Sequence, residues 1–296
     1  MPSVKVSFIG FGEVASVFSK PMRERGAEVA AYDILLSQDE GREILQERVR
    51  TEGIRFRPLP EVVGDADYVL STVATQAAKE AARECAPHLK PGQIYVDLNS
   101  MAPSLKVEVG EIIRTSGADF VEGAILGAVG ATGAGTRILV GGEKGREVAK
   151  TLTRLGLHVS YYSPEIGKAS MFKMLRSIFS KGLEALILEL LIAGKRAGLE
   201  EDLWKDITEF MTRNPFDRVA SNWVRTHAVA YERRYHEMVQ VGETMRESGV
   251  EPVMTSGTEA FFKRSLSLGL KEAFLEKPSS MEAVIDFMEK RLREKQ

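Results

Sequence analysis

Lys173 lies among apolar residues, which is unusual for a lysine: Met171, Phe172, Met174 and Leu175 surround it in the sequence. A lysine in such a setting can act as acid and base when burial and nearby positive charge lower its pKa towards neutrality. Lys173 is therefore a candidate for proton transfer, the alternative being an ordinary solvated helix lysine.

A G-x-G-x-x-A pattern follows the first apolar run of the chain. Gly10 permits a tight turn, Gly12 lets the backbone approach a pyrophosphate, and Ala15 is small enough for a helix to pack closely on the strand. The helix beginning near Glu13 and Val14 would point its free amides at the phosphates. The pattern predicts that these five residues bind a dinucleotide, the alternative being a nucleotide-free turn between strand and helix.

Asp33 ends the second apolar run, at the distance from the glycines where an acid binds the hydroxyls of the adenosine ribose. The same carboxylate would repel the 2′-phosphate of NADP, and no lysine or arginine follows before Arg42. We therefore predict NAD as the cofactor, with NADP disfavoured. Val73 and Ala74, at the end of the strand expected over residues 68–73, and Asn99 are expected to complete the cofactor site.

The elements that must hold these residues alternate between short apolar runs and amphipathic, charge-rich segments. Strands are expected over residues 4–10, 28–33, 68–73, 94–97, 120–125, 136–141 and 158–162, and helices over 15–25, 76–89, 104–116 and 144–155. This alternation is typical of βαβ units. It predicts an α/β fold whose N-terminal part is a Rossmann-like, doubly wound, mostly parallel sheet.

The pattern changes after Pro164, and from Gly167 onward it is helical almost throughout. Breaks are expected near residues 198, 214–215, 249–252 and 277–278. Because 296 residues exceed what one core usually holds, we predict an NAD-binding domain over 1–165 and an all-α substrate and dimerisation domain over 166–296. Residues 182–194 are apolar nearly all round, which indicates a core or subunit-interface helix and favours a homodimer through the C-terminal helices.

Composition limits the classes of function. The formal net charge of −2 favours neither a nucleic-acid nor a membrane partner. The single cysteine, Cys85, excludes an intrachain disulfide, and the four histidines lack the spacing of a metal site. No apolar stretch approaches the length of about 18 residues that a membrane span requires, and the start lacks a signal-peptide pattern. We expect a cytoplasmic protein with a small-molecule substrate and no metal.

Four segments resemble the β-hydroxyacid dehydrogenase family, which includes 6-phosphogluconate and 3-hydroxyisobutyrate dehydrogenases. Residues 8–15 carry the glycine motif, and residues 94–100 look like the family strand that ends in a hydroxyl-bearing pair near the nicotinamide. Residues 121–128 align with the substrate loop, and residues 167–173 look like the catalytic-lysine helix. The resemblance implies hydride transfer between NAD and a hydroxy acid or related alcohol, with Lys173 as general acid/base. The C-terminal half is similar to a bacterial subgroup whose substrates are mostly unassigned.

The substrate contacts that the resemblance implies depart from the usual family pattern. The loop usually carries Ser-Gly-Gly, where this chain has Leu126, Gly127 and Ala128. The serine hydroxyl is therefore gone, but the Gly127 amide can still approach a substrate oxygen. The family's asparagine after the lysine is replaced here by Arg176 or Ser177.

Arg176 and Glu237 each leave more than one interpretation open. Arg176 could hold a substrate carboxylate in a bidentate contact, lower the pKa of Lys173, or pair with an acid such as Glu184. In the family, an acidic residue on a C-terminal helix approaches the nicotinamide side of the cleft. Glu237 matches that position loosely, and a solvated helix face is the alternative.

Two rival functions remain for a chain of this type. An imine reductase of the same architecture usually lacks the lysine, and a non-catalytic dinucleotide-binding module would be expected to have replaced it. The presence of Lys173 argues against both rivals.

Overall fold

The computed structural model describes residues 3–37, 41, 43–45, 47 and 54–295, so that Arg42 lies outside the described residues. The chain divides into two compact units, Met1–Ile178 and Phe179–Gln296. The first unit thus runs past the boundary predicted at residue 165 and includes the beginning of the long helix α8 (Lys168–Ala197).

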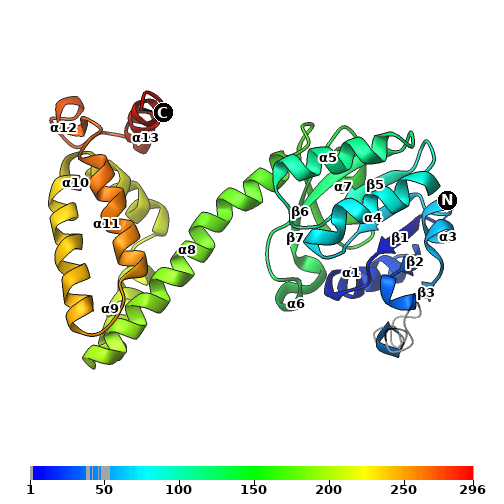
Figure 1. Ribbon diagram of the computed structural model, residues 1–296, viewed down its shortest axis with the longest axis horizontal. Helices are drawn as coiled ribbons and strands as arrows, with labels where there is room; N and C mark the ends of the chain where they lie inside the picture. Colours follow the sequence, from blue (N-terminus) through cyan, green and yellow to red (C-terminus); the bar gives the residue numbers. More distant parts are fainter. Residues whose placement is uncertain (1–2, 38–40, 42, 46, 48–53, 296) are drawn as a thin grey trace. The chain divides into compact units, whose positions relative to one another are not determined.

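Within its described residues, the first unit forms one eight-stranded sheet in the order β3-β2-β1-β4-β5-β6-β7-β8 (Figure 1). The strands are β1 (Lys5–Ile9), β2 (Glu28–Tyr32), β3 (Arg55–Phe56), β4 (Tyr68–Ser71), β5 (Ile94–Asp97), β6 (Asp119–Ile125), β7 (Arg137–Gly141) and β8 (His158–Ser163). Neighbouring strands pair in parallel apart from β6 and β7, which are antiparallel. The predicted mostly parallel sheet is confirmed. Of the strands described, only the short β3 was not predicted from the sequence.

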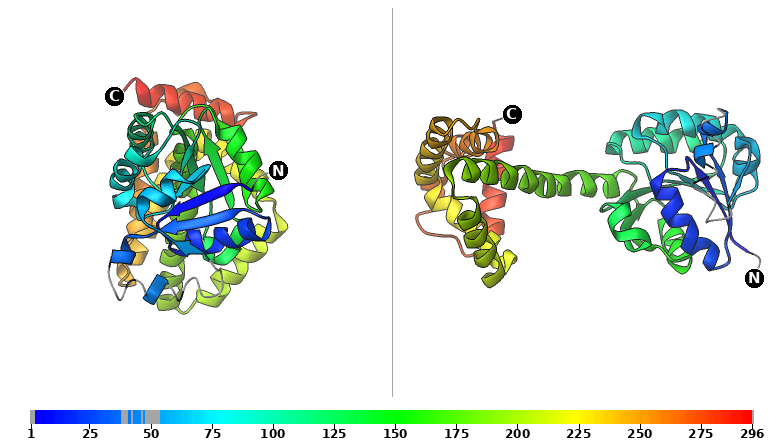
Figure 2. Two further views of the ribbon diagram at one scale, coloured as in Figure 1. Left: turned by 90° about the vertical axis from the view of Figure 1, so that its right-hand side faces the viewer. Right: turned by 90° about the horizontal axis from the view of Figure 1, so that it is seen from below.

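Helices cover both faces of this sheet (Figure 2). They are α1 (Glu13–Glu24), α3 (Leu59–Gly64), α4 (Ala78–Cys85), α5 (Pro103–Arg114), α6 (Val129–Thr132) and α7 (Gly145–Arg154). Side chains alternate along the strands, so that Phe8 packs with α1 and α7, whereas its neighbour Ile9 packs with α3, α4 and α5. The two hydrophobic cores hold the carboxyl ends of the strands in fixed positions.

The chain reverses its direction of winding at β1. This strand pairs with β2 on one side and with β4 on the other. The loops that follow β1 and β4 therefore part from each other at the carboxyl edge of the sheet. Open α/β sheets bind their ligands in the crevice at such a switch point.

The second unit is helical. It contains the second part of α8, α9 (Glu200–Arg213), α10 (Phe216–Glu247), α11 (Val253–Ser265), α12 (Leu270–Ala273) and α13 (Met281–Arg293). The four predicted breaks all fall between these helices, and an unpredicted break separates α11 from α12. Tyr231, Leu268 and Leu270 form a buried cluster against α13. No helix in the described part of the chain is both long and apolar enough to cross a membrane.

Candidate active site

Two adjoining cavities border the carboxyl ends of β1 and β4. The Asp33 cavity has a volume of about 360 Å³ and is lined by residues that include Gly10, Gly12, Tyr32, Asp33, Ile34, Glu80 and Glu84. The Lys173 cavity has a volume of about 330 Å³ and is lined by residues that include Glu13, Val14, Asn99, Ser100, Gly127 and Lys173. Thr72, Val73 and Ala74 line both cavities. The fold thus brings most of the predicted site residues of the first unit to one cleft.

The two motif glycines are required for different reasons. Gly10 has a φ of +81°, and a Cβ there would lie 2.8 Å from Val73 Cγ1 and 2.9 Å from the carbonyl oxygen of Thr72. A Cβ on Gly12, in contrast, would meet no atom of the described residues within 4 Å. Gly12 also begins α1 without a side-chain cap, so the first amides of that helix are available to an anion. The cradle therefore fits a pyrophosphate.

Asp33 is held against the glycine turn by two backbone amides. Its Oδ2 accepts a hydrogen bond from Phe11 N at 2.7 Å, and its Oδ1 accepts one from Leu35 N at 3.0 Å. Each carboxylate oxygen keeps a further lone pair for a ligand hydroxyl. Burial raises the pKa of the neighbouring Tyr32, and the negative charges of Glu84 and Asp33 raise it further. The Asp33 cavity is therefore acidic on the side of Asp33 and Glu84.

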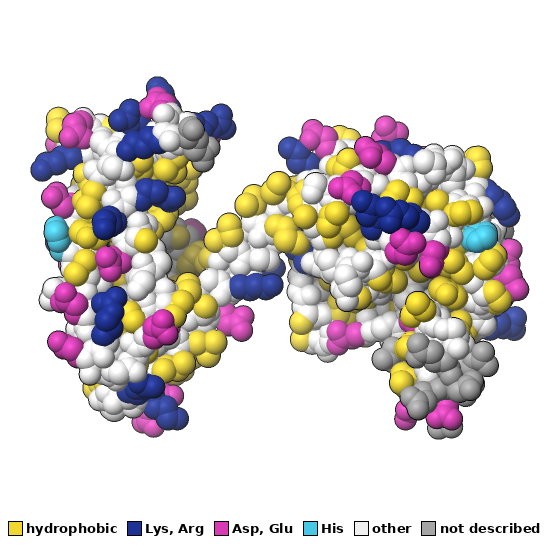
Figure 3. Space-filling view, in the orientation of Figure 1, with side chains coloured by type: hydrophobic (Ala, Val, Ile, Leu, Met, Phe, Trp, Pro, Cys, Tyr) yellow, Lys and Arg dark blue, Asp and Glu magenta, His cyan; other side chains and the backbone are white. Residues whose placement is uncertain are grey.

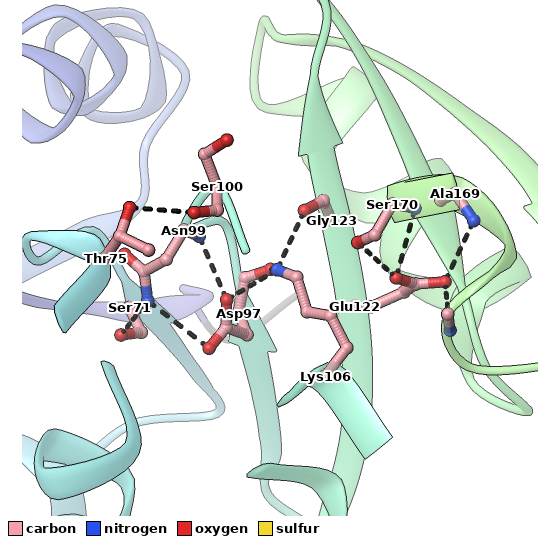
Figure 4. Close-up of polar contacts among 11 residues, drawn as sticks. Ser71, Thr75, Asp97, Asn99, Ser100, Lys106, Glu122, Gly123, Ala169 and Ser170 are labelled. Carbon is pink, nitrogen blue, oxygen red and sulfur yellow. Dashed lines mark hydrogen bonds and ion pairs between the residues drawn. The ribbon is translucent and has the colours of Figure 1, made fainter. Parts of the chain in front are cut away.

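Asn99 presents an unsatisfied acceptor at the Lys173 cavity (Figure 4). Its Nδ2 donates to Ser71 Oγ at 2.9 Å and to Asp97 Oδ2 at 3.3 Å, which fixes the orientation of the amide. Its Oδ1 is buried and has no hydrogen-bond partner among the described residues. A buried acceptor without a partner costs about 1–3 kcal/mol. The site therefore fits a ligand that donates a hydrogen bond here, such as a ribose hydroxyl or a carboxamide.

Asp97 is part of a buried ion pair that sequence reasoning missed. Lys106 Nζ donates to Asp97 Oδ1 at 2.6 Å, to the Asp97 carbonyl at 2.8 Å and to the Gly123 carbonyl at 3.1 Å. A signal was present, because Lys106 falls on the same face of α5 as Val109 and Ile113, which are both buried. A lysine on the apolar face of a helix must find a buried partner.

The helix that carries Lys173 begins at a second buried acid that the sequence did not single out. Glu122 on β6 accepts hydrogen bonds from Gly167 N at 2.7 Å, Ala169 N at 3.0 Å and Ser170 N at 3.3 Å. It also accepts one from Ser170 Oγ at 2.7 Å. Lys173, one turn further along α8, lies partly buried in the cavity wall.

The remaining site residues predicted in the first unit lie elsewhere than the cavity walls. Ala15 is fully buried in the core, in agreement with its predicted packing role. Leu126 packs beside Ala124 and Leu139 rather than lining the Lys173 cavity. The Ser177 hydroxyl donates to the Lys173 carbonyl at 3.0 Å, and Arg176 is exposed and is not among the lining residues.

Glu237 is exposed on α10 of the second unit and forms an ion pair with Arg233. Such a pair is typical of a solvated helix face. The described residues contain no group of three or more His, Cys, Asp or Glu side chains that could hold a metal ion.

Comparisons with known proteins concern the two parts of the chain separately. Residues 5–163 match a family model described as the NAD binding domain of 6-phosphogluconate dehydrogenase. Residues 195–265 match a domain of unknown function, DUF1932. The predicted dinucleotide-binding domain is confirmed.

Three individual proteins illustrate the range of similarity. One is a conserved protein described as structurally similar to 3-hydroxyacid dehydrogenases; it is 34% identical, with 93% of this chain and 100% of that chain covered and a TM-score of 0.61. The 2-(hydroxymethyl)glutarate dehydrogenase of Eubacterium barkeri is 22% identical over 213 residues, which is 69% of this chain and 68% of that protein. An imine reductase of Streptomyces aurantiacus is 15% identical, covers 96% of this chain and 99% of its own, and has a TM-score of 0.76. This last likeness concerns the fold alone.

Proposed function

Because this chain belongs to the family of β-hydroxyacid dehydrogenases related to 6-phosphogluconate dehydrogenase, we propose that it oxidises a hydroxy acid, or a related alcohol, with NAD. One observation carries the proposal: Lys173 lines the same cavity as Asn99, Gly127 and the beginning of α1. A proton-transfer group thus lies beside the residues expected to hold the cofactor.

The proposed chemistry assigns one task to each part of the cavity. NAD, when bound, supplies the acceptor for the hydride that leaves the carbinol carbon. Lys173 Nζ takes the hydroxyl proton as the carbon–oxygen double bond forms, and returns it in the reverse direction. The Gly127 amide is a donor for a substrate oxygen, and the Asn99 Oδ1 accepts a hydrogen bond from the cofactor.

We propose NAD rather than NADP because of the charge around the Asp33 cavity. Asp33, Glu80 and Glu84 all line it. A 2′-phosphate would bring about two negative charges close to these carboxylates. An unphosphorylated ribose would instead donate its hydroxyls to Asp33.

The experiment that tests this function is a dehydrogenase screen of hydroxy acids and polyols, with and without phosphate groups, against both cofactors. We expect NAD-dependent oxidation of at least one hydroxy acid. Lys173→Met should then lower turnover by about 10² to 10⁴ and leave NAD binding unchanged. Wild-type turnover in that variant would show that Lys173 is not the general acid/base. Turnover with imines alone would favour an imine reductase, and cofactor binding without any turnover would favour a non-catalytic module.

We also propose that two copies pair through helices of the second unit. Leu186, Leu188 and Ile192 of α8 are about half exposed, as are Trp204 and Trp223, and Figure 3 shows hydrophobic side chains exposed along α8. Apolar side chains that gather in this way on a helix surface are typical of a subunit interface. Light scattering should give the mass of a dimer, and a monomer at micromolar concentration would contradict this.

A further inference from the structure

Glu122 is a carboxylate in a strand that is otherwise buried and apolar. Its side chain has no exposure to solvent, and Val121, Gly123 and Ala124 beside it are also buried. Removing a charge from water is costly unless hydrogen bonds replace the lost hydration. The position therefore needs partners, and those found among the described residues all come from the beginning of α8.

The four partners of Glu122 are all donors. They are the amides of Gly167, Ala169 and Ser170 and the hydroxyl of Ser170. They reach both oxygens of the group, which is therefore bound as a carboxylate. The acid takes up amides that the first turn of a helix leaves without partners, and its negative charge lies at the positive end of α8 (Figure 4).

The neighbouring strand leaves room for this carboxylate. Gly141 on β7 pairs with Glu122 in the antiparallel register. A Cβ on Gly141 would lie 2.9 Å from Glu122 Oε1 and 3.2 Å from its Cγ. The contact between β6 and α8 thus depends on Gly141 of β7, because any larger side chain there would clash with the Glu122 carboxylate.

This contact joins two walls of the Lys173 cavity. Lys173 follows Ser170 by three residues, so the two side chains lie on the same face of α8. Strand β6 continues from Glu122 to Ile125, and Gly127 shortly after it lines the same cavity as Lys173. The hydrogen bonds of Glu122 therefore fix the position of Lys173 relative to the loop that contains Gly127.

We propose that Glu122 is a positioning residue for Lys173: it anchors the first turn of α8. Its negative charge opposes the lowering of the Lys173 pKa by burial and nearby positive charge. The proposal rests on the proposed function for its kinetic consequence only. Other charged groups around these elements are Glu13 in the cavity wall, Arg176 in the next turn of α8 and the buried Lys106–Asp97 pair, whose Lys106 donates to Gly123 of β6. The variants below leave these groups in place.

The chain offers a matched control in Glu189 of α8. This acid accepts hydrogen bonds from Met254 N, Thr255 N and Thr255 Oγ1 at the start of α11, at 2.7, 2.8 and 2.8 Å. Glu189→Gln therefore removes the same kind of helix anchor within the second unit. Ser170→Ala is the graded variant, because it removes one hydrogen bond of Glu122 and keeps the charge.

The experiment measures turnover, NAD affinity and the reactivity of Lys173 in the full chain. Reactivity is followed by competitive acetylation against exposed Lys150, with peptide mass spectrometry over a range of pH. Because only the neutral amine reacts, the midpoint of the curve reports the protonation of Lys173 without any need for turnover. Glu122→Gln should move this midpoint to lower pH because a negative charge is lost, and it should reduce kcat by about tenfold or more because Lys173 is no longer held in place. NAD affinity should stay within about twofold of the wild type, since the cradle is unchanged.

The two comparison variants should behave differently. Ser170→Ala should lower kcat by a smaller factor without moving the midpoint, and Glu189→Gln should change neither quantity. An unchanged midpoint in Glu122→Gln would overturn the proposal, since a simple helix cap would affect stability alone. If Glu122→Gln does not fold, an unchanged kcat in Ser170→Ala would overturn it instead. Absence of turnover in the wild type would refute the proposed function, whereas the labelling midpoint would still decide the role of Glu122.

Discussion

The Nζ atom of Lys106 lies 2.6 Å from Oδ1 of Asp97, and neither side chain is exposed to solvent. This ion pair supports the turn after β5, since Asp97 in turn accepts hydrogen bonds from the backbone and side-chain amides of Asn99. The orientation of Asn99 therefore depends on the positive charge of Lys106, which lies on α5. The cost of removing that charge is the first quantity to measure.

Replacing Lys106 with Met should lower the free energy of unfolding by about 3–5 kcal/mol, because Asp97 would be left as an uncompensated buried charge. Urea denaturation measures the change. Lys79→Met is the control, since Lys79 forms an ion pair with Glu108 at the surface, and such pairs contribute about 1 kcal/mol or less. Equal effects of the two substitutions would contradict the importance of the buried pair.

Alanine at the two motif glycines should separate folding from cofactor binding. Gly10→Ala should lower both thermal stability and NAD affinity, because of its positive φ and the close contacts with Val73 and Thr72. Gly12→Ala should leave the stability of the free protein nearly unchanged and still weaken NAD binding, because the added methyl group occupies space meant for the ligand. Melting curves with and without NAD provide the measurement. Unchanged NAD affinity in Gly12→Ala would place the cofactor elsewhere.

The acidic wall of the Asp33 cavity should determine the choice of cofactor. The wild type should bind NAD at least about tenfold more tightly than NADP, a difference of about 1.4 kcal/mol. Asp33→Asn should reduce this preference because it removes the charge that opposes the 2′-phosphate. Glu84→Gln should reduce it by less, since Glu84 is exposed and solvent screens its charge more than that of the half-buried Asp33. Titration of both cofactors tests this, and equal or tighter NADP binding by the wild type would refute it.

His227 should make the second unit sensitive to acid. Burial, together with the positive charge of Arg234, lowers the pKa of His227 from 6.5 to about 4, and its Nε2 hydrogen-bonds with Ser265 Oγ at 3.0 Å. Between these pH values the unfolded chain binds a proton at His227 and the folded chain does not. The free energy of unfolding should therefore fall as the pH decreases from about 6.5 to about 4, by about 3 kcal/mol in total.

The control for this effect is His227→Gln, which keeps a polar side chain that does not titrate. Denaturation of both proteins across this pH range isolates the contribution of His227 from that of the carboxyl groups. The difference in stability between the two proteins should shrink as the pH falls. A difference that stays constant with pH would show that His227 is not the group responsible.

Local spacing was enough to predict much of the first unit from the sequence. The Gly10 turn, the start of α1 and the acid at Asp33 occupy consecutive parts of one βαβ unit, so their arrangement follows from backbone geometry over a short stretch. Lys173 stood out because its neighbours are apolar. The breaks in the second unit were predictable for a related reason, since glycine and proline act on the backbone where they stand.

The partners of the buried charges were decided only by the tertiary structure. Lys106 finds Asp97, and Glu122 finds the amides of α8, across elements that are distant in the sequence. Neither pairing follows from local spacing, because each depends on strand order and on which face a side chain takes. The direction of Leu126, which packs beside Leu139 rather than lining the cavity, was settled in the same way. The sequence thus determined which residues could carry out the chemistry, and the packing of α5 and α8 on the sheet determined what holds them, because a buried charge is stable only beside partners that the whole fold brings to it.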